Sequence, residues 1–345
     1  GEPTARLPDC PTARLRGATM IGVGVIGAGW WAGEHARAVA ALPDLRLVAC
    51  ASRSAERRAA FASTYGCAGY EDYRALLADR AIDAVAIATS HDSHAAIAID
   101  ALAAGKHVLL EKPLARDRQE CALVAAAARQ ASTIFLVGLT HHFTPLVAEA
   151  RALAARGEIG AVVAAFCAYS QPWRGEQRPR FYRERALGGG VWLTLGVHFV
   201  DRLLWLIDSE VVAVKAVLGQ RFHPPDEQQA DDMATVLLQF ASGATGTIVV
   251  AGYRDGAPWL TMQLLGDRGA LRLDGDGLAL GHNNAWQPVA VAATNPMEVE
   301  WAAFARSITD GTPPPISLDY ALRVMDVVFA AEESAATGRE KLLGR

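Results

Sequence analysis

The sequence predicts two folds in succession: an α/β fold built on a doubly wound parallel (Rossmann) sheet, then an α+β domain with a large, mostly antiparallel open sheet. Three observations indicate this. A glycine turn follows a short apolar run near the start, and β-branched runs alternate with alanine-rich stretches up to about residue 137. Long strand-like runs then follow one another without helices between them. We therefore assign residues 20–139 to the first domain and residues 140–345 to the second.

The glycine turn comes first along the chain. It reads Gly-Ala-Gly-Trp-Trp-Ala over residues 27–32 and follows an apolar run, residues 21–26, that predicts a buried strand. Gly27 suits a tight turn, Gly29 lets the backbone approach a phosphate, and Ala32 lets the next helix pack closely. The turn is therefore a candidate pyrophosphate site of a dinucleotide.

Two further points bear on this turn. A second register, residues 22–27, also spells G-x-G-x-x-G, but it leaves only residues 20 and 21 to form the strand, so we reject it. Trp30 and Trp31 stand at the start of the helix and join the cofactor-binding candidates. Any sharp strand-to-helix turn favours glycine, and that structural interpretation stays open at this point.

Hydrophobic periodicity predicts the remaining elements. In the first domain we expect strands at 45–51, 84–88, 108–111 and 133–137, and helices at 33–41, 54–65, 94–104 and 117–129. In the second we expect strands at 161–169, 211–218, 233–240, 245–251 and 260–265, and helices at 146–156, 194–206, 298–309 and 318–336. The first set forms βαβ units, which require a parallel sheet.

Composition and charge exclude several classes of function. Apolar residues make up 51% of the 345, and the net charge of −4 gives no basic footprint for nucleic acid or an anionic membrane. The five cysteines include no C-x-x-C pair, so neither a disulfide framework nor a zinc site is indicated, and we expect a cytoplasmic protein. No apolar run approaches the roughly 20 residues that span a bilayer. We expect residues 1–19 to form a disordered leader outside the fold.

The residues after the second predicted strand bear on the choice of cofactor. A dinucleotide fold usually carries an acidic residue about 20 positions beyond the glycines, where it binds the adenosine ribose. Here residues 51–54 read Ala-Ser-Arg-Ser. Ser52 can donate a hydrogen bond to a 2′-phosphate and Arg53 can supply positive charge, which favours NADP over NAD. In the alternative interpretation Ser54 caps the next helix and Arg53 is solvated, which is compatible with cofactor binding.

Two later segments carry a family resemblance. Residues 86–94 read Ala-Ile-Ala-Thr-Ser-His-Asp-Ser-His, and residues 104–113 end in Glu-Lys-Pro directly after an apolar strand. Together with the glycine turn, they resemble the glucose-fructose oxidoreductase/inositol dehydrogenase (Gfo/Idh/MocA) family, over nearly the whole chain from residue 20 onward. The Glu-Lys-Pro element at the strand end is the most specific local mark of that resemblance.

The resemblance implies roles for the residues at these strand ends. Thr89, His91 and Glu111 would approach the nicotinamide and its ribose, with His94 and Lys112 also among the cofactor-binding residues. Lys112 would face the reacting hydroxyl or carbonyl as well. The carboxyl ends of strands are where an open α/β sheet binds its ligands, and an ammonium there polarises a carbonyl or stabilises an alkoxide. Lys112 is thus a candidate catalytic residue, the alternative being a solvated surface lysine.

A glycine-rich segment, residues 188–201, is similar to the family's second catalytic segment. Its His198 is the candidate acid/base, because a histidine titrating near neutrality can take up or return the hydroxyl proton. Thr194, His198 and Asp201 are spaced to lie near one face of a helix. Thr194, a candidate substrate contact, stands where an aspartate is common in the family, so His198 should be less basic here. The alternative for His198 is a satisfied core histidine.

Four more residues complete the candidate substrate site. His142 lies in the segment that joins the two domains, where arginine is frequent in the family, and the adjacent histidine offers no complete ligand set, so we assign no metal. Trp173, Arg174 and Tyr182 lie in a cationic, aromatic loop that can grip a polyhydroxylated or anionic substrate. Solvation is the alternative for the loop's outer arginines.

The sequence therefore predicts an NADP(H)-preferring oxidoreductase, with NAD as the alternative cofactor. It would interconvert a secondary alcohol and a carbonyl on a sugar, cyclitol or related ring compound. A dihydrodiol or aromatic-semialdehyde dehydrogenase of the same fold, and a non-catalytic dinucleotide-binding sensor, are the alternatives. The resemblance implies that the exposed face of the antiparallel sheet packs against another subunit, giving a homodimer or homotetramer.

Overall fold

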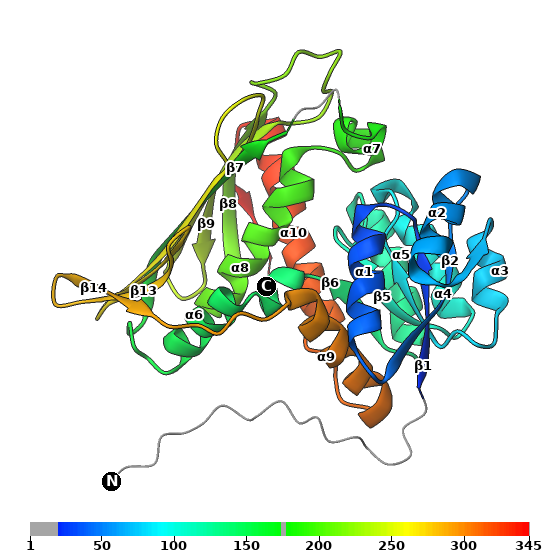
Figure 1. The fold of residues 1–345 in the computed structure, drawn as a ribbon. Coiled ribbons are helices and arrows are strands. Elements are labelled where there is room, and N and C mark those ends of the chain that lie inside the picture. Colours follow the sequence, from blue (N-terminus) through cyan, green and yellow to red (C-terminus); the bar gives the residue numbers. More distant parts are fainter. Residues whose placement is uncertain (1–19, 174–176, 345) are drawn as a thin grey trace, which may run out of the picture.

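The computed structural model describes residues 20–173 and 177–344. It contains a six-stranded and a nine-stranded sheet with helices between them (Figure 1). The expected leader, residues 1–19, and Arg174 lie outside the described residues.

The six-stranded sheet is parallel throughout, with strand order β3-β2-β1-β4-β5-β6. Its strands are β1 (Ile21–Ile26), β2 (Leu45–Ala51), β3 (Ala68–Tyr70), β4 (Ala84–Ile87), β5 (His107–Glu111) and β6 (Phe135–Gly138). β1 and β4 are buried along their whole length, as expected of strands covered on both faces. The strand order reverses at β1, and ligands of such sheets bind at the carboxyl ends next to that point.

Five helices belong to this sheet: α1 (Trp30–Ala41), α2 (Ala55–Tyr65), α3 (Tyr73–Ala78), α4 (His94–Ala103) and α5 (Arg118–Gln130). Side-chain oxygens of Ser54, Asp72 and Asp117 accept hydrogen bonds from backbone N–H groups and so begin α2, α3 and α5. α1 has no side-chain cap of this kind, and its first N–H groups are left for another partner.

The nine-stranded sheet has strand order β14-β13-β12-β11-β7-β10-β9-β8-β15. Its strands are β7 (Val162–Pro172), β8 (Val211–Gly219), β9 (Met233–Phe240), β10 (Thr245–Tyr253), β11 (Trp259–Gly266), β12 (Ala270–Asp274), β13 (Gly277–His282), β14 (Ala285–Val289) and β15 (Lys341–Leu342). Every neighbouring pair is antiparallel except β7 and β10. Buried and more exposed residues alternate along β9 and β10, so one face of the sheet meets the core.

The remaining helices are α6 (Pro145–Ala155), α7 (Arg180–Arg183), α8 (Val197–Ile207), α9 (Pro296–Asp310) and α10 (Leu318–Thr337). In Figure 1, α8 and α10 lie on the face of the large sheet that is turned toward the parallel sheet. The indole of Trp192 is fully buried and its Nε1 donates to the carbonyl oxygen of Val328 on α10, at 2.9 Å. α9 returns to the first sheet and packs beside α1.

The structure confirms the predicted fold class. The strands predicted at 45–51 and 233–240 have those bounds, whereas β3, α3 and the short strands β12 to β15 were not predicted. The segment Arg185–Ile207 has the length and composition of a membrane span, which the search for apolar runs did not find, but 83% of its most apolar window is buried within the protein. Burial of that extent is typical of a core helix. The division at residue 139 stays a prediction.

Candidate active site

The glycine turn leaves open space at the start of α1. Gly27 has φ +125°, and a Cβ there would lie 2.2 Å from the carbonyl oxygen of Ala88, so this position needs glycine. Gly29 has φ −95°, and a Cβ there would meet no atom within 4 Å. With the uncapped N–H groups of α1 beside this space, the turn fits the pyrophosphate of a dinucleotide. Gly22 and Gly24 lie inside β1, which confirms the choice of register.

Trp30 and Trp31 flank that space from the first turn of α1. The Trp30 side chain is exposed, Trp31 is half-buried, and their rings meet edge to face at 4.6 Å. Apolar surface is thus held next to the open helix start, where it can cover part of a bound dinucleotide. Their predicted cofactor contact stays a prediction.

The tip of β2 carries no carboxylate. The Ser54 hydroxyl accepts from the backbone N–H of Arg57 at 3.3 Å, so the capping interpretation is confirmed for that residue. The carbonyl oxygen of Ser52 accepts from the guanidinium of Arg58 at 2.6 Å, while Arg53 is exposed. The guanidinium of Arg58 also pairs with Glu71 at 3.9 Å. The Ser52 hydroxyl and the Arg53 guanidinium fit the adenosine end of a dinucleotide, including one with a 2′-phosphate.

Lys112 is buried at the end of β5, not solvated. Its Nζ donates to the carbonyl oxygen of Thr194 at 2.9 Å and its side chain is 7% exposed. Burial lowers the pKa of Lys112, and the nearby guanidinium of Arg178 lowers it further against the opposing effect of Glu111. An ammonium with a lowered pKa gives up and regains its proton closer to neutral pH. Position and acidity both suit a group that handles the charge of a reacting oxygen.

A chain of hydrogen bonds holds Glu111 beside Lys112. The indole Nε1 of Trp301 donates to Nδ1 of His35 at 3.0 Å, so Nε2 of His35 carries the proton and donates to Oε1 of Glu111 at 3.1 Å. The other carboxylate oxygen accepts from the backbone N–H of Lys112 at 3.2 Å. Sequence analysis missed His35 and Trp301, because partners 266 positions apart leave no local motif.

His198 lies on α8 and stacks on a second imidazole. The rings of His141 and His198 are 3.8 Å apart with an interplanar angle of 23°. Burial holds the pKa of His198 well below its usual value, with help from His141, Lys112 and Arg202. Its Nδ1 and the Oγ1 of Thr194 have no hydrogen-bond partner among the described residues. The interpretation of His198 as a satisfied core histidine therefore does not fit, since a neutral ring with an unused nitrogen can accept a proton.

The structure places His142 away from the His198 ring, and its predicted substrate contact stays a prediction. The ring that meets His198 is that of His141, whereas Nδ1 of His142 lies 3.0 Å from Oδ1 of Asp201 and its ring packs on Trp205. The hydroxyl of Tyr320 donates to the same Asp201 carboxylate at 2.8 Å. His142 is thus a buried link between helices.

The spacing of Thr194, His198 and Asp201 is not that of one regular α-helix, and their common face stays a prediction. A π-helical turn, Trp192–Gly196, precedes α8 and changes the spacing between Thr194 and the two later residues. The carbonyl of Thr194 therefore reaches Lys112, while Asp201 turns toward His142.

The residues after β4 form a buried frame for the site. His91 donates through Nδ1 to the carbonyl oxygen of Gly188 at 2.7 Å, and His94 donates through Nδ1 to that of Pro113 at 2.8 Å. Burial lowers the pKa of both imidazoles, which favours the neutral form of each. Oγ1 of Thr89 accepts from the hydroxyl of Ser93 at 2.8 Å. The frame ties the strand end that carries Lys112 to the glycine-rich segment, and the predicted cofactor contacts of these residues stay predictions.

The aromatic loop places a different arginine at the site. Trp173 is 1% exposed and its Nε1 donates to Gln228 at 3.2 Å. Its predicted substrate contact stays a prediction. The guanidinium of Arg178, which sequence analysis did not select, lies 3.9 Å from the Trp173 ring centroid. Tyr182 is half-buried and its ring meets that of His91 at 5.5 Å.

A buried carboxyl group holds the glycine-rich segment in place. Gly190 has φ +106°, and a Cβ there would lie 2.2 Å from Oδ1 of Asp231. Oδ2 of Asp231 accepts from the backbone N–H of Trp192 at 2.7 Å. Burial raises the pKa of Asp231 to about 7, and the charge of Glu332 adds to the effect.

We expect Asp231→Asn to remove a pH dependence of stability. Folded Asp231 keeps its proton up to about pH 7, whereas the unfolded carboxyl releases it near 3.8. Folding therefore binds a proton between these values, and stability falls as pH rises through this window. At pH 8 the Asn variant should melt about 2–6 °C above the unmodified protein, with a smaller difference at pH 5. Thermal melts at the two pH values measure this, and a difference that grows toward pH 5 would contradict it.

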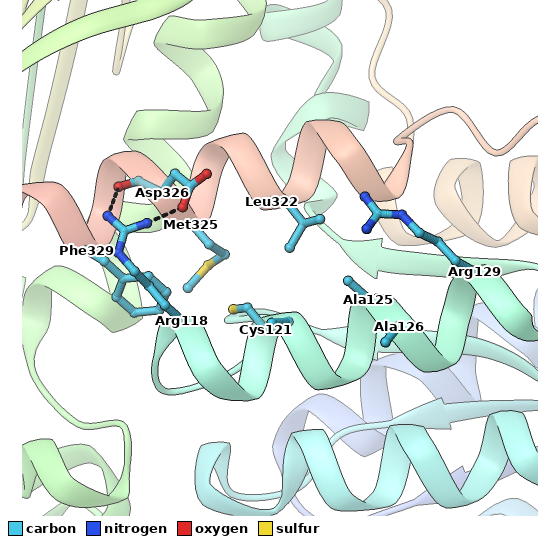
Figure 2. A pocket seen from close by; sticks show the side chains of 10 residues that line it. Arg118, Cys121, Ala125, Ala126, Arg129, Leu322, Met325, Asp326 and Phe329 are labelled. Atoms are coloured by element: carbon cyan, nitrogen blue, oxygen red, sulfur yellow. Dashed lines mark hydrogen bonds and ion pairs between the residues drawn. The ribbon is translucent and has the colours of Figure 1, made fainter. Parts of the chain in front are cut away.

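A pocket of about 290 Å³ lies elsewhere, between α5 and α10 (Figure 2). Apolar side chains, including those of Leu322, Met325 and Phe329, line its interior. Arg118 closes one end through ion pairs with α10, and Arg129 stands at the other. Its lining includes none of the residues that sequence analysis assigned to the site.

Comparison with known proteins agrees with this geometry. Residues 21–139 match a model described as an oxidoreductase family with an NAD-binding Rossmann fold, and residues 147–272 match the GFO/IDH/MocA C-terminal domain. Levoglucosan dehydrogenase of Pseudarthrobacter phenanthrenivorans is 28% identical over 73% of this chain and 73% of its own length. The 1,5-anhydro-D-fructose reductase of Ensifer adhaerens is 32% identical over 67% of this chain and 68% of its own.

A solved structure of an enzyme from antibiotic biosynthesis is also similar to this chain. GenD2 from gentamicin A biosynthesis, crystallised in complex with NAD, is 27% identical and superposes with a TM-score of 0.83, covering 95% of this chain and 97% of that one. The two family models together span most of the chain, and its relatives are named dehydrogenases and reductases. The chain therefore belongs to the Gfo/Idh/MocA family and is an NAD(P)-dependent oxidoreductase that acts on hydroxyl groups.

Proposed function

We propose that this oxidoreductase prefers NADP(H) and interconverts a secondary alcohol and a carbonyl on a sugar, cyclitol or related ring compound. One observation carries the proposal. The buried Lys112 ammonium meets the carbonyl of Thr194 at 2.9 Å, and His198, whose Nδ1 has no partner among the described residues, is close enough for the Lys112 charge to lower its pKa. A cation and a neutral base thus share a site at the carboxyl end of the parallel sheet.

Lys112 and His198 divide the work on the substrate oxygen. When bound, a nicotinamide dinucleotide supplies or accepts the hydride. In alcohol oxidation, neutral His198 takes the hydroxyl proton while Lys112 donates a hydrogen bond to the oxygen and stabilises its developing negative charge. In carbonyl reduction, Lys112 polarises the C=O group and protonated His198 returns the proton. The low pKa of His198 keeps its base form populated at neutral pH.

The preference for NADP(H) is supported by the tip of β2. Ser52 and Arg53 stand where a carboxylate would repel a 2′-phosphate, and Arg53 is exposed. We expect Arg53→Glu to weaken NADPH binding by about 10–100-fold and to change NADH binding much less, because only NADPH carries the extra phosphate. Parallel fluorescence titrations of both reduced cofactors measure this.

Arg80→Glu is the matched control, since Arg80 is also exposed and lies at a turn away from β2. Equal losses for NADPH and NADH in Arg53→Glu would contradict the assignment of the 2′-phosphate to Arg53. Tighter binding of NADH than NADPH by the unmodified protein would overturn the proposed preference altogether.

The bare face of the nine-stranded sheet supports a homodimer or homotetramer. Phe166 pairs in register with Thr247 and Gln263, and Thr247 pairs with Leu237, so these side chains share one outer face. The exposed fractions of Phe166 and Leu237 are 42% and 41%. Exposed apolar residues grouped on a sheet are typical of an interface. A monomer mass by light scattering at micromolar concentration would contradict it.

Two alternatives have separate readouts. Turnover of dihydrodiols or aromatic semialdehydes, with none of sugars or cyclitols, would replace the proposed substrate class. Tight binding of NADPH without oxidation or reduction of any compound tested would indicate a sensor. The paired proton-handling groups Lys112 and His198 argue against a sensor, which has no use for them.

A further inference from the structure

Arg202 is a buried cation without a protein partner among residues 20–173 and 177–344. The residue is 6% exposed, and its buried Nε has no hydrogen-bond partner in the described chain. Its guanidinium lies 5.3 Å from the Phe199 ring centroid. A buried guanidinium that lacks a carboxylate costs stability, and such groups are usually paired. The site around Arg202 is therefore suited to bind an anionic ligand.

Arg202 lies on the same side of α8 as the proposed base. It follows His198 by four residues, one helical turn, so the two side chains are neighbours. Arg202 is close enough to lower the pKa of both His141 and His198. Nδ1 of His141 is also buried without a partner among the described residues. Unused polar groups are thus gathered around the proposed reaction site.

The carboxylates near this cluster are already engaged. Asp201 accepts from Tyr320 and lies 3.0 Å from Nδ1 of His142. Glu111 accepts from His35 and from the backbone of its neighbour. Lys112, Arg178 and Arg202 therefore bring three positive charges to the site against two nearby carboxylates, Glu111 beside Lys112 and Asp201 beside Arg202. A neutral substrate would leave this excess uncompensated.

We propose that Arg202 binds a carboxylate of the substrate, so that the ring compound handled here is a hydroxy acid or the matching oxo acid. The inference rests on the proposed function, because it locates the carboxylate relative to the hydroxyl at Lys112 and His198. The planar fork of a guanidinium matches the two oxygens of a carboxylate, and one guanidinium balances its single charge. A phosphate dianion would need a second cation. Lys112 is assigned to the reacting oxygen, and Arg178 donates to the Trp173 carbonyl oxygen at 2.6 Å and packs on the Trp173 ring.

Calorimetry with matched compounds tests this on the protein saturated with oxidised NADP. The pairs are D-glucuronate with D-glucose and D-galacturonate with D-galactose, and D-glucose 6-phosphate is the phosphate probe. We expect each acid to bind about 10–100-fold more tightly than its neutral partner, and the ratio to fall to about one in Arg202→Met. Arg202→Lys should keep part of the preference, because it keeps the charge but not the fork.

Two controls separate ligand binding from structure. Arg180→Met removes an arginine whose side chain is 72% exposed, and it should leave the preference unchanged. Arg202→Met should raise the unfolding temperature by about 1–3 °C, because an apolar side chain replaces an unpaired buried charge. A merely structural role for Arg202 predicts a lower unfolding temperature and an equal loss for acids and neutral sugars.

Each contrary outcome has its own meaning. Equal affinities within both pairs, or no measurable binding of either acid, would overturn the proposal, and tighter binding of the sugar phosphate would overturn the choice of carboxylate. Turnover of neutral sugars without acid binding would leave the proposed function standing. Selective acid binding without turnover of any alcohol would contradict the proposed function but support Arg202 as the anion site of a sensor.

Discussion

Lys112→Met lowers kcat by about 10²–10⁴-fold and leaves dinucleotide affinity within a few-fold, if Lys112 handles the charge on the reacting oxygen. The ammonium is buried and its Nζ lies 2.9 Å from the Thr194 carbonyl oxygen, next to the proposed base. Methionine fills a similar volume but supplies neither charge nor proton. Removing a buried ammonium in favour of an apolar chain should not unfold the protein, which a thermal melt verifies.

Lys106→Met is the matched control for this variant. Lys106 lies just before the same strand, and its Nζ donates to the backbone carbonyls of Asp79 and Ile82, away from the site. Steady-state rates and NADPH titrations are measured on both variants. An unchanged kcat in Lys112→Met would mean that Lys112 is not a catalytic residue. A loss of NADPH affinity as large as the loss of kcat would mean that Lys112 binds the cofactor instead.

Gly29→Val weakens dinucleotide binding by about 100-fold or more without lowering stability. Gly29 has an extended backbone that valine adopts readily, and a Cβ there would touch no atom within 4 Å. The added side chain occupies only the space beside the free N–H groups of α1, where a pyrophosphate would lie. Titration with NADPH, together with a thermal melt, separates occlusion of the cofactor from damage to the fold.

Gly275→Val is its control in a hairpin of the other sheet. A Cβ at Gly275 also meets nothing within 4 Å, and the residue lies between β12 and β13. Both variants should have the same unfolding temperature as the unmodified protein, and only Gly29→Val should lose NADPH affinity. Unchanged NADPH affinity in Gly29→Val would mean that the dinucleotide does not use this turn.

The fold and the strand ends were predictable because both depend on local patterns. A buried parallel strand needs a continuous apolar run, which is how residues 21–26 and 45–51 gave β1 and β2 with their bounds. The glycine turn needs glycine at specific positions, and the positive φ of Gly27 is one that other residues rarely adopt. Lys112 could be assigned to the site because it comes directly after the last residue of β5. Short edge strands such as β15, with two residues, carry no comparable pattern.

The parts of the site that were not predicted depend on contacts that no local pattern encodes. His141 and His142 are adjacent and chemically identical, and the backbone turn alone decides which ring meets His198. The π-helical turn before α8 changes the spacing between Thr194 and the residues of α8, which no local pattern predicted. Arg202 looks like an ordinary polar residue of an amphipathic helix until its burial is known.

The most direct test of the central claim is to incubate the protein with oxidised NADP and a panel of ring alcohols, following the absorbance of reduced nicotinamide. The panel holds neutral sugars, cyclitols, sugar acids and dihydrodiols. We predict continuous reduction of NADP with at least one sugar, cyclitol or sugar acid, and loss of that signal in Lys112→Met. A protein that binds NADPH but reduces NADP with none of the panel, or equally well without Lys112, would contradict the account.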